Sequence, residues 1–502
     1  MKMKRIVILV LLLATLTIGS TIFLTKSSVD STIISEPKQK AITLTIVTRH
    51  DTTITSEFTS RFLATPEAIA LGITALDFRQ ATTDDGWKKL LEDPSKSVDI
   101  AWGGGPALFN TMDNWGLLYH VDPVADADLF TAMNDSVPAI LAGAEMKSFD
   151  GTGKLIWAAN VISSFGFTVN YDFLDTYGLP IPSTWEELAS PTYYISDSVK
   201  AISMGDPPLT TSNTRIYQII LQAFGWEAGW KIITKMAANS GIYPGSVDTR
   251  AAVVSGEVGI GMTIDFYGVI AHRENPNCEY IIPQGESIVN GDPIALGINV
   301  DDYDAAVAFL KFVFSPEGQT AWMSPGLDRL PVNESAFHTP EGSTYTEIYA
   351  LYNQTLANEG IPFNETLATL NLDTTIYYFH NTITQKHDLL RKAWGELVSK
   401  YRAAEINASY FLELSNMIGV PGMTEQQSID WDPQYISDPN FAAQKDSEWR
   451  AYAGNQYCAV LAALGDPCSS GTTTKTPFGF VPAIISSIAV ATITLIYKKK
   501  KN

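Results

Sequence analysis

The sharpest candidate site in this sequence is a glycine-rich loop, Trp102-Gly103-Gly104-Gly105-Pro106, which follows a short apolar segment. Consecutive glycines let the backbone approach a ligand closely and turn N–H groups toward an anion. A helix that begins after Pro106 would add the positive end of its dipole. The same glycines could instead form only a tight turn between a strand and a helix. The neighbouring Trp102 favours the binding interpretation.

A hydroxyl, a cation and an imidazole come directly after the first expected strand. They belong to Thr48, Arg49 and His50. The carboxyl ends of parallel strands are where such sheets present ligands, so we assign these residues to a ligand site. For Arg49 the alternative is a surface salt bridge. Asn160, which ends a later expected strand, is assigned to the same site.

Four further polar residues follow expected strands or begin expected helices. They are Ser212, Asn213, Asp265 and Tyr267. Ser212 and Asn213 could instead cap a helix, and Asp265 and Tyr267 could be turn residues. Each is weak evidence alone, and the hypothesis of a ligand site depends on their recurrence after successive strands.

The residue patterns of common enzymes are missing from the sequence. None of the six histidines forms a metal-ligand pair at helical spacing, and there is no nucleophile elbow, phosphate loop or calcium-binding acidic cluster. We therefore expect a binding protein that is not an enzyme and has no cofactor and no resident metal. A secreted hydrolase with a carboxylate pair is the enzymatic alternative.

The net charge of the chain excludes some partners. The 502 residues carry −20, but seven of the 34 basic residues lie at the two ends, so the interior is seven units more negative, at −27. Proteins that bind nucleic acid need clustered lysines and arginines to neutralise phosphates. An acidic interior argues against nucleic acid and against docking of the body on an anionic membrane.

Both ends of the chain carry an uncharged apolar run beside basic residues, which is typical of membrane-targeting or membrane-spanning segments. Residues 1–25 are expected to form a signal peptide or signal anchor, followed by a linker at 26–40. Residues 478–497 are expected to form a transmembrane helix, with a linker at 469–477 before it and a cytoplasmic tip at 498–502 after it. Because basic residues mark the cytoplasmic side, we expect an extracellular body attached to the cell membrane.

Two of the three cysteines are close in sequence. Cys458 and Cys468 enclose a short segment that contains Gly465 and Pro467. Outside the cell a local disulfide between them is expected, with two unpaired thiols as the alternative. Cys278 has no evident partner.

The body alternates expected strands and helices up to about residue 341 and is helical beyond it. This order predicts an α/β fold with a mostly parallel sheet and ligand loops at the strand carboxyl ends. The expected strands are Ile42–Val47, Val98–Trp102, Leu155–Asn160, Phe165–Tyr171, Ala201–Met204, Gly259–Ile264 and Ile294–Val300, and the expected helices include Glu57–Leu63, Asp85–Leu91, Arg215–Phe224, Glu227–Ala238, Asp248–Val254, Tyr303–Phe314 and Lys386–Ala404.

Three stretches of the body resemble the motifs of one known family. Asp99–Gly103 resembles the strand before its first ligand loop, and Asn170–Asp172 with Gly178–Leu188 resembles its Gly-Leu-Pro and Thr-Trp signature. Ala305–Gln319 ends in Ser-Pro-Glu-Gly-Gln, like the closing motif of the family. On these residues the chain resembles, over about 40–335, a family 1 extracellular solute-binding protein of an ABC importer, with the type II periplasmic-binding-protein fold.

Within that family the chain is most similar to ferric-iron, thiamine and phosphonate binders, because of its Thr-Arg-His loop and its Asp-Pro strand end. The predicted transmembrane tail resembles that of archaeal relatives. The adjacent tyrosines of iron binders have no clear counterpart, since Tyr193-Tyr194 is too early and Tyr377-Tyr378 lies in the helical tail.

The resemblance implies two α/β lobes, a helical C-terminal extension and terminal transmembrane segments. Lobe one would hold 41–160 and the chain from 298 onward, so that 298–468 would contain the return of lobe one and the helical C-terminal region. Lobe two would hold 161–297. The chain would cross between lobes near 159–161 and 294–299. A small solute, ferric iron or a small anion would bind between the lobes and be presented to an ABC permease with its ATPase. A surface sensor or adhesin that reuses the fold is the alternative.

Overall fold

The computed structural model describes residues 41–81, 83–466 and 468. The expected N-terminal segment and linker, and the expected C-terminal linker, transmembrane helix and tip, lie outside these residues. Within the described part of the chain, no helix combines the length and apolar character needed to cross a membrane.

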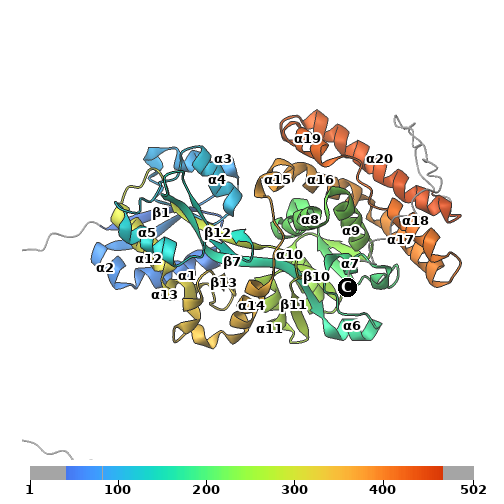
Figure 1. Ribbon diagram of the computed structural model, residues 1–502, viewed down its shortest axis with the longest axis horizontal. Coiled ribbons are helices and arrows are strands. Elements are labelled where there is room, and N and C mark those ends of the chain that lie inside the picture. Colours follow the sequence, from blue (N-terminus) through green and yellow to red (C-terminus); the bar gives the residue numbers. More distant parts are fainter. Residues whose placement is uncertain (1–40, 82, 467, 469–502) are drawn as a thin grey trace, which may run out of the picture. The chain divides into compact units, whose positions relative to one another are not determined.

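One sheet of 11 strands runs through the body, and its first half contains the strands that precede the first two candidate loops (Figure 1). β1 (Ile42–Thr48) lies between β2 (Ile73–Gln80) and β3 (Ile100–Trp102), and all three are parallel. β12 (Val289–Leu296) pairs antiparallel with β3 and then with β7 (Leu155–Asn170). The sequence did not predict β2, in which only Ile73 is buried and the other residues are half-buried or exposed.

The second half of the sheet continues from β7 through β10 (Ile260–Ile264) and β8 (Ile202–Gly205) to β9 (Ser240–Tyr243). β10 is antiparallel to β7 and parallel to β8, and β8 is parallel to β9. Three further strands also pair with β7: β6 (Lys147–Phe149), β11 (Cys278–Ile281) and β13 (Leu330–Pro331). A second, separate sheet has two strands, β4 (Ile140–Leu141) and β5 (Ala144–Glu145).

The long strand β7 connects the two halves and corrects the prediction of two separate strands at Leu155–Asn160 and Phe165–Tyr171. All 16 of its residues are buried. The polar pair Ser163-Ser164 resembles a break in the sequence, yet both side chains are hydrogen-bonded inside the protein: the Ser163 hydroxyl accepts from Arg329, and the Ser164 hydroxyl donates to the Asp265 carboxylate. The second crossing strand, β12, begins and ends earlier than the expected Ile294–Val300, because it pairs with β7 from Val289 onward.

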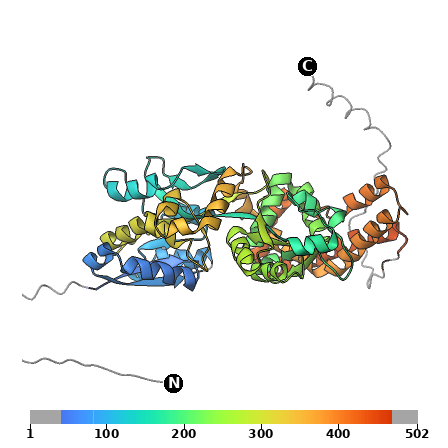
Figure 2. The same cartoon turned by 90° about the horizontal axis from the view of Figure 1, so that it is seen from below.

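The two largest apolar cores lie in two lobes on either side of β7 (Figure 1, Figure 2). The first core contains Phe58, Trp102 and Trp322, and the second contains Trp185, Tyr217 and Trp230. The first lobe holds α1 (Thr52–Leu63), α2 (Pro66–Leu71), α3 (Asp84–Leu91), α4 (Pro106–Asn114), α5 (Ala127–Asp135), α12 (Tyr303–Phe314), α13 (Pro316–Ala321) and α14 (Thr346–Ala357), and the second holds α6 (Tyr171–Tyr177), α7 (Trp185–Leu188), α8 (Thr211–Phe224), α9 (Trp226–Ala238), α10 (Ser246–Val254) and α11 (Asp265–Glu274).

The C-terminal helices pack on the second lobe, which corrects the expectation that residues from 298 onward return to the first. Phe379, Trp394, Trp449 and Tyr457 belong to the same apolar core as Tyr217, and the Phe379 ring stacks on the Tyr217 ring at 4.5 Å. Of the chain from residue 298 onward, only the part up to about the end of α14 belongs to the first lobe. The C-terminal helices are α15 (Glu365–Leu370), α16 (Leu372–Thr382), α17 (His387–Arg402), α18 (Ala408–Met417), α19 (Glu425–Ser437) and α20 (Pro439–Ala463).

The expected disulfide between Cys458 and Cys468 is present. It ties Cys468, which lies beyond the end of α20 at Ala463, back to Cys458 within that helix. Cys278 is buried and unpaired within the described residues.

Candidate ligand-binding site

The two candidate loops of the first lobe meet at one edge of the sheet. Thr48 and Trp102 are register partners at the ends of the parallel strands β1 and β3, so the residues that follow them are neighbours. Asp51 then caps α1, with its carboxylate accepting from the backbone N–H groups of Thr53 at 2.8 Å and Ile54 at 3.1 Å.

The three glycines adopt a conformation that other residues rarely take. Gly103, Gly104 and Gly105 have φ angles of 81°, 108° and 85°. A Cβ on Gly103 would lie 2.6 Å from His50 Nε2, and one on Gly104 would lie 3.2 Å from Arg49 Cδ. The loop is therefore packed closely by the side chains of the neighbouring loop. The backbone of α4 begins directly after it, and no side chain caps the start of that helix.

His50 is a buried neutral imidazole. Its residue is 5% exposed, and its Nε2 has no hydrogen-bond partner among the described residues. The rings of Trp102 and Trp322 contact its ring edge to face, at centroid distances of 4.8 and 5.4 Å. Burial lowers the pKa of His50 to about 4, against a smaller opposing influence of the Asp292 carboxylate. At neutral pH the His50 imidazole carries no charge, and its Nε2 is left to form a hydrogen bond with a ligand.

Arg49 forms the surface ion pair that the sequence left open as an alternative. Its guanidinium lies 2.9 Å from the Asp84 carboxylate, and both side chains are partly exposed. The cation is thus at the strand end where the sequence placed it, but part of its hydrogen-bonding capacity is used.

Two predicted ligand residues of the first lobe lie inside the core. Trp102 and Asn160 are fully buried and bonded to each other, with 2.9 Å between indole Nε1 and Oδ1. Asn160 Nδ2 also donates to the Asp292 carbonyl at 2.6 Å, and Gln319 donates to the Asn160 carbonyl at 2.8 Å. These side chains join β3, β7 and β12 and position the loops instead of facing a ligand.

In the second lobe, three hydroxyls meet between the first turns of α8 and α10, and we call them the hydroxyl cluster: Thr210, Ser212 and Ser246. The Ser246 hydroxyl lies 2.5 Å from the hydroxyls of both Thr210 and Ser212. Thr210 caps α8, so the alternative that Ser212 and Asn213 cap this helix is wrong. Asn213 is buried instead, where it accepts from Gly205 N–H at 2.9 Å and donates to Ser246 at 3.2 Å.

Asp265 and Tyr267 follow β10, as predicted, but only the tyrosine is partly open. The buried Asp265 carboxylate accepts from the Ser164 N–H at 2.6 Å, and burial raises its pKa to about 6. Tyr267 is half-buried with its ring 5.6 Å from the Arg250 guanidinium. Asp265 therefore anchors β7 to β10.

Two arginines that the sequence did not mark as candidates lie beside the aromatic residues at the start of α11. Arg329 donates to the Asp292 carboxylate at 2.7 Å and to the Ser163 hydroxyl at 3.0 Å. Its guanidinium lies 5.5 Å from the rings of Trp322 in the first lobe and Phe266 in the second. Its Nε has no hydrogen-bond partner in the described chain, which leaves one donor unused where the lobes meet.

Arg250 is the second such arginine. It lies on α10, one turn after Ser246, and its side chain is 17% exposed. Its nearest acidic partner is the Glu274 carboxylate at 3.6 Å, and its Nε is unpartnered within the described residues. No sequence pattern marks either arginine, because each acquires its neighbours through tertiary packing.

The assembled groups are of kinds that interact with anions. Arginines, hydroxyls and open helix N-termini stabilise negative charge. In the described part of the chain, no group of three or more histidine, cysteine, aspartate or glutamate residues could hold a metal ion.

Comparison with known proteins identifies a family. The family model described as "Bacterial extracellular solute-binding protein" matches residues 67–350. The match covers the glycine loop, the hydroxyl cluster and both arginines. It leaves Thr48–His50 and the C-terminal helices α15 to α20 outside.

One curated relative is the phosphoglycerate transport regulatory protein PgtC of Salmonella typhimurium, 24% identical over 332 residues, which are 66% of this chain and 78% of the relative. Among solved structures, the GacH receptor of Streptomyces glaucescens matches with a TM-score of 0.54 at 14% identity, over 72% of this chain and 97% of that one. Iron-bound HitA of Pseudomonas aeruginosa matches with a TM-score of 0.45 at 16% identity, over 62% and 99%.

Proposed function

The chain belongs to the bacterial extracellular solute-binding proteins of ABC transporters, and on that premise we propose that it holds a small anionic solute between its lobes and presents it to an ABC permease. The observation that carries the proposal is the second-lobe group of Arg250, the hydroxyl cluster and the start of α10. It offers a cation, hydroxyls and open N–H groups within one helical turn. Family membership favours transport over the sensor or adhesin alternative.

The interlobe position of Arg329 supports the same solute class. Its guanidinium is in contact with aromatic rings of both lobes, so an anion near it would gain by bringing the lobes together. Contacts made to both lobes shift an existing equilibrium toward the closed arrangement. The strongly acidic remainder of the chain makes these cations local exceptions, which favours selective capture over general attraction.

An anion is preferred to the ferric iron that the family resemblance also allowed. The adjacent pair Tyr193 and Tyr194 is buried, and both hydroxyls are used, by the Pro180 carbonyl and the Asp197 carboxylate. The name of the relative PgtC refers to phosphoglycerate transport, and phosphorylated carboxylic acids are accordingly the first anions to test.

We also propose that the protein is held at the outer face of the cell membrane by its terminal apolar runs. The uncharged segments within residues 1–25 and 478–497, each next to basic residues, support this arrangement.

Thermal unfolding of the purified protein in the presence of candidate solutes tests the proposal. A solute that binds only the folded state raises the midpoint of unfolding. We expect 3-phosphoglycerate or another small phosphorylated acid to stabilise the protein, and glycerol to leave it unchanged. Stabilisation by a neutral sugar alone would contradict the assignment of an anion.

A further inference from the structure

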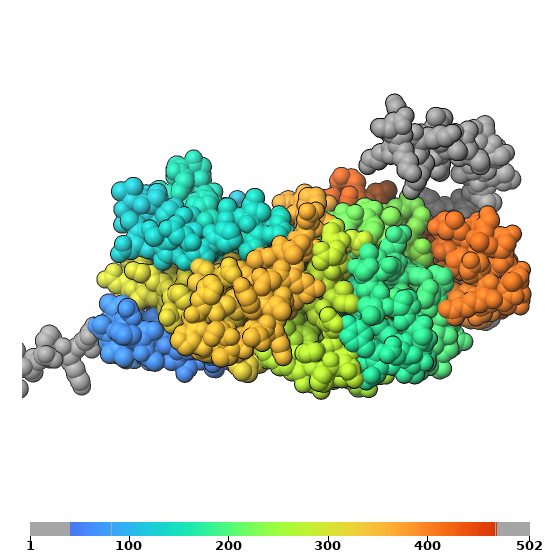
Figure 3. Space-filling view, turned by 60° about the horizontal axis from the view of Figure 1, so that its bottom comes forward, coloured from blue at the N-terminus to red at the C-terminus, as the bar shows by residue number. Residues whose placement is uncertain are grey.

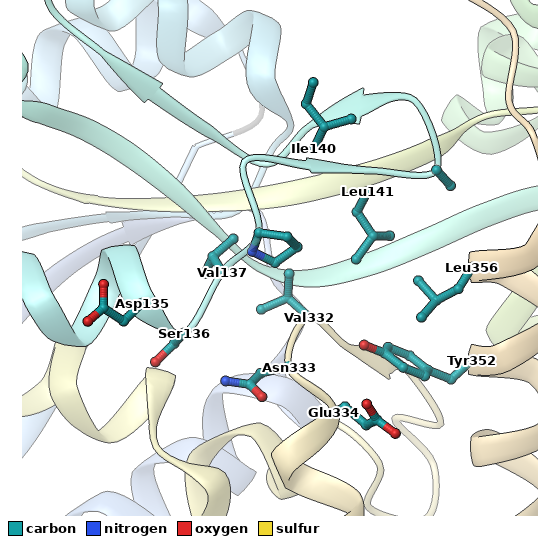
Figure 4. A pocket seen from close by; sticks show the side chains of 12 residues that line it. Asp135, Ser136, Val137, Ile140, Leu141, Val332, Asn333, Glu334, Tyr352 and Leu356 are labelled. Atoms are coloured by element: carbon teal, nitrogen blue, oxygen red, sulfur yellow. The ribbon is translucent and has the colours of Figure 1, made fainter.

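A cavity of about 560 Å³ lies in the first lobe and shares no residue with the candidate anion site. Three segments line it: residues 135–142 after α5, residues 332–334 after β13, and one face of α14 (Figure 4). In the space-filling view these segments, cyan and gold, lie side by side on one face of the molecule (Figure 3).

One wall of the cavity is apolar and partly exposed to water. Val137, Leu141, Val332 and Leu356 form this wall. Ile140 at its rim is 64% exposed and Leu356 is 38% exposed. An occupant with a hydrocarbon body would remove these side chains from water, which is favourable.

A single tyrosine hydroxyl opens into the cavity without a partner. Tyr352 is 4% exposed, and its hydroxyl makes no hydrogen bond with any described residue. Its neighbour Tyr349 differs, since that hydroxyl donates to the Glu334 carboxylate at 2.9 Å. Figure 4 shows the Tyr352 oxygen turned from α14 toward Val332 and Glu334 on the opposite wall. The hydroxyl oxygen is open to the space of the cavity and is therefore available for a ligand there.

The charged lining is entirely negative. Asp135 and Glu334 line the cavity, and no lysine or arginine does. Lys147 lies near this loop, but its ammonium donates to the carbonyls of Asn134 and Val137 at 2.8 Å and to the Asn134 side chain at 2.9 Å. Lys147 is close enough to Asp135 to interact with it electrostatically. The Glu334 carboxylate forms no ion pair with any described residue, which favours a positively charged occupant at its end of the cavity.

We propose that this cavity is a second binding site, which takes a small organic cation with an ammonium group on an aliphatic body. The ammonium group lies against the Glu334 carboxylate and the Tyr352 hydroxyl, which lie at the same end of the cavity (Figure 4). The aliphatic body covers the wall of Val332, Leu141 and Leu356. The site is independent of the anion site, and its occupancy does not depend on the proposed transport function.

The test is a saturation-transfer NMR titration of the full-length protein with 6-amino-1-hexanol. The neutral control is 1,6-hexanediol, which has the same chain and lacks the ammonium group. We expect saturable binding of the amino alcohol and binding at least about tenfold weaker for the diol, since bonds to charged groups contribute about 1.5–3 kcal/mol. Equal binding of both compounds, or no saturable binding of the amine, would overturn the proposal.

Two variants locate the site. Tyr352→Phe removes only the unpartnered hydroxyl and Glu334→Gln removes one charge, so each is expected to weaken amine binding by about 3- to 10-fold. Tyr345→Phe is the matched control, because its hydroxyl is bonded to Glu341 at 3.0 Å and does not line the cavity. Unchanged affinity in both cavity variants would place the amine elsewhere and refute the site.

Discussion

The strand-end loops of the two lobes use their polar side chains in opposite ways. In the first lobe His50 is buried between two tryptophans and Arg49 is paired with Asp84. In the second lobe the hydroxyl cluster lies at the start of α10, and Arg250 keeps an unpartnered Nε. The lobe with the more recognisable sequence motif thus offers a neutral imidazole and a closely paired cation, whereas the other lobe offers hydroxyls and a cation whose acidic partner is 3.6 Å away. A glycine-rich loop after a strand indicates close packing as readily as ligand contact.

The largest expected effect concerns the first lobe. Gly103→Ala should cost about 3–4 kcal/mol of unfolding free energy, because a Cβ there meets His50 Nε2 at 2.6 Å and φ is 81°. Gly116→Ala is the matched control, since its φ is 70° and nothing lies within 4 Å of its Cβ position. Urea denaturation of both variants measures the difference. Equal losses would mean that His50 does not pack on the loop.

A second expectation contrasts the buried titrating groups of the lobes. The pKa of His50 is lowered from 6.5 to about 4, so folded His50 stays neutral while the unfolded chain takes up a proton. Its contribution of about 3 kcal/mol is complete above pH 6.5 and is lost as the pH falls toward 4. The pKa of Asp265 is raised to about 6, so its destabilising contribution is present above pH 6 and is relieved on acidification.

Denaturation curves between pH 4 and pH 7.5 check both signs. His50→Asn should lose stability less steeply than the natural protein as the pH falls, and Asp265→Asn should lose it more steeply. Parallel curves for all three proteins would contradict the burial of these charges.

The third expectation compares anion binding by an arginine from each lobe. Arg250→Ala should weaken binding of 3-phosphoglycerate by about 10- to 150-fold, because a charge-assisted hydrogen bond contributes about 1.5–3 kcal/mol. Arg49→Ala should weaken it by less than about fivefold, since its charge is already paired with Asp84. Isothermal titration calorimetry measures these affinities. Arg402→Ala, on the exposed end of α17, is the control variant and should bind 3-phosphoglycerate like the natural protein. A larger loss for Arg49→Ala would reverse the comparison of the lobes.

The smallest expected effect is on stability. Loss of the exposed Arg49–Asp84 pair should cost less than about 1 kcal/mol, and less still in high salt. Denaturation of Arg49→Ala at low and at high ionic strength measures it. A loss above 2 kcal/mol at both ionic strengths would show that the pair is structural.

Much of the fold was predictable from local patterns, and the errors have physical causes. The helices α8, α9, α10 and α12 follow from their apolar periodicity, and the disulfide follows from cysteine spacing. The single strand β7 was missed because its two serines find buried partners far away in sequence. The C-terminal helices were assigned to the wrong lobe because helix periodicity does not reveal which core receives the apolar face.

The candidate site was predictable only in part. The strand-end positions of Arg49, His50 and the glycines follow from the alternation of strands and loops. The burial of Trp102 and Asn160, and the placing of Arg329 beside Phe266, depend on contacts between residues more than 50 positions apart. Such contacts leave no trace in the spacing of one sequence.

A crystal structure of the protein with 3-phosphoglycerate, or with the phosphorylated acid that stabilises it most, tests the central claim most directly. The account predicts the anion between the lobes, with its negative group bonded to Arg250, to the hydroxyl cluster and to backbone N–H groups at the start of α10. An anion bound elsewhere, with Arg250 and the hydroxyl cluster free of it, would contradict the account.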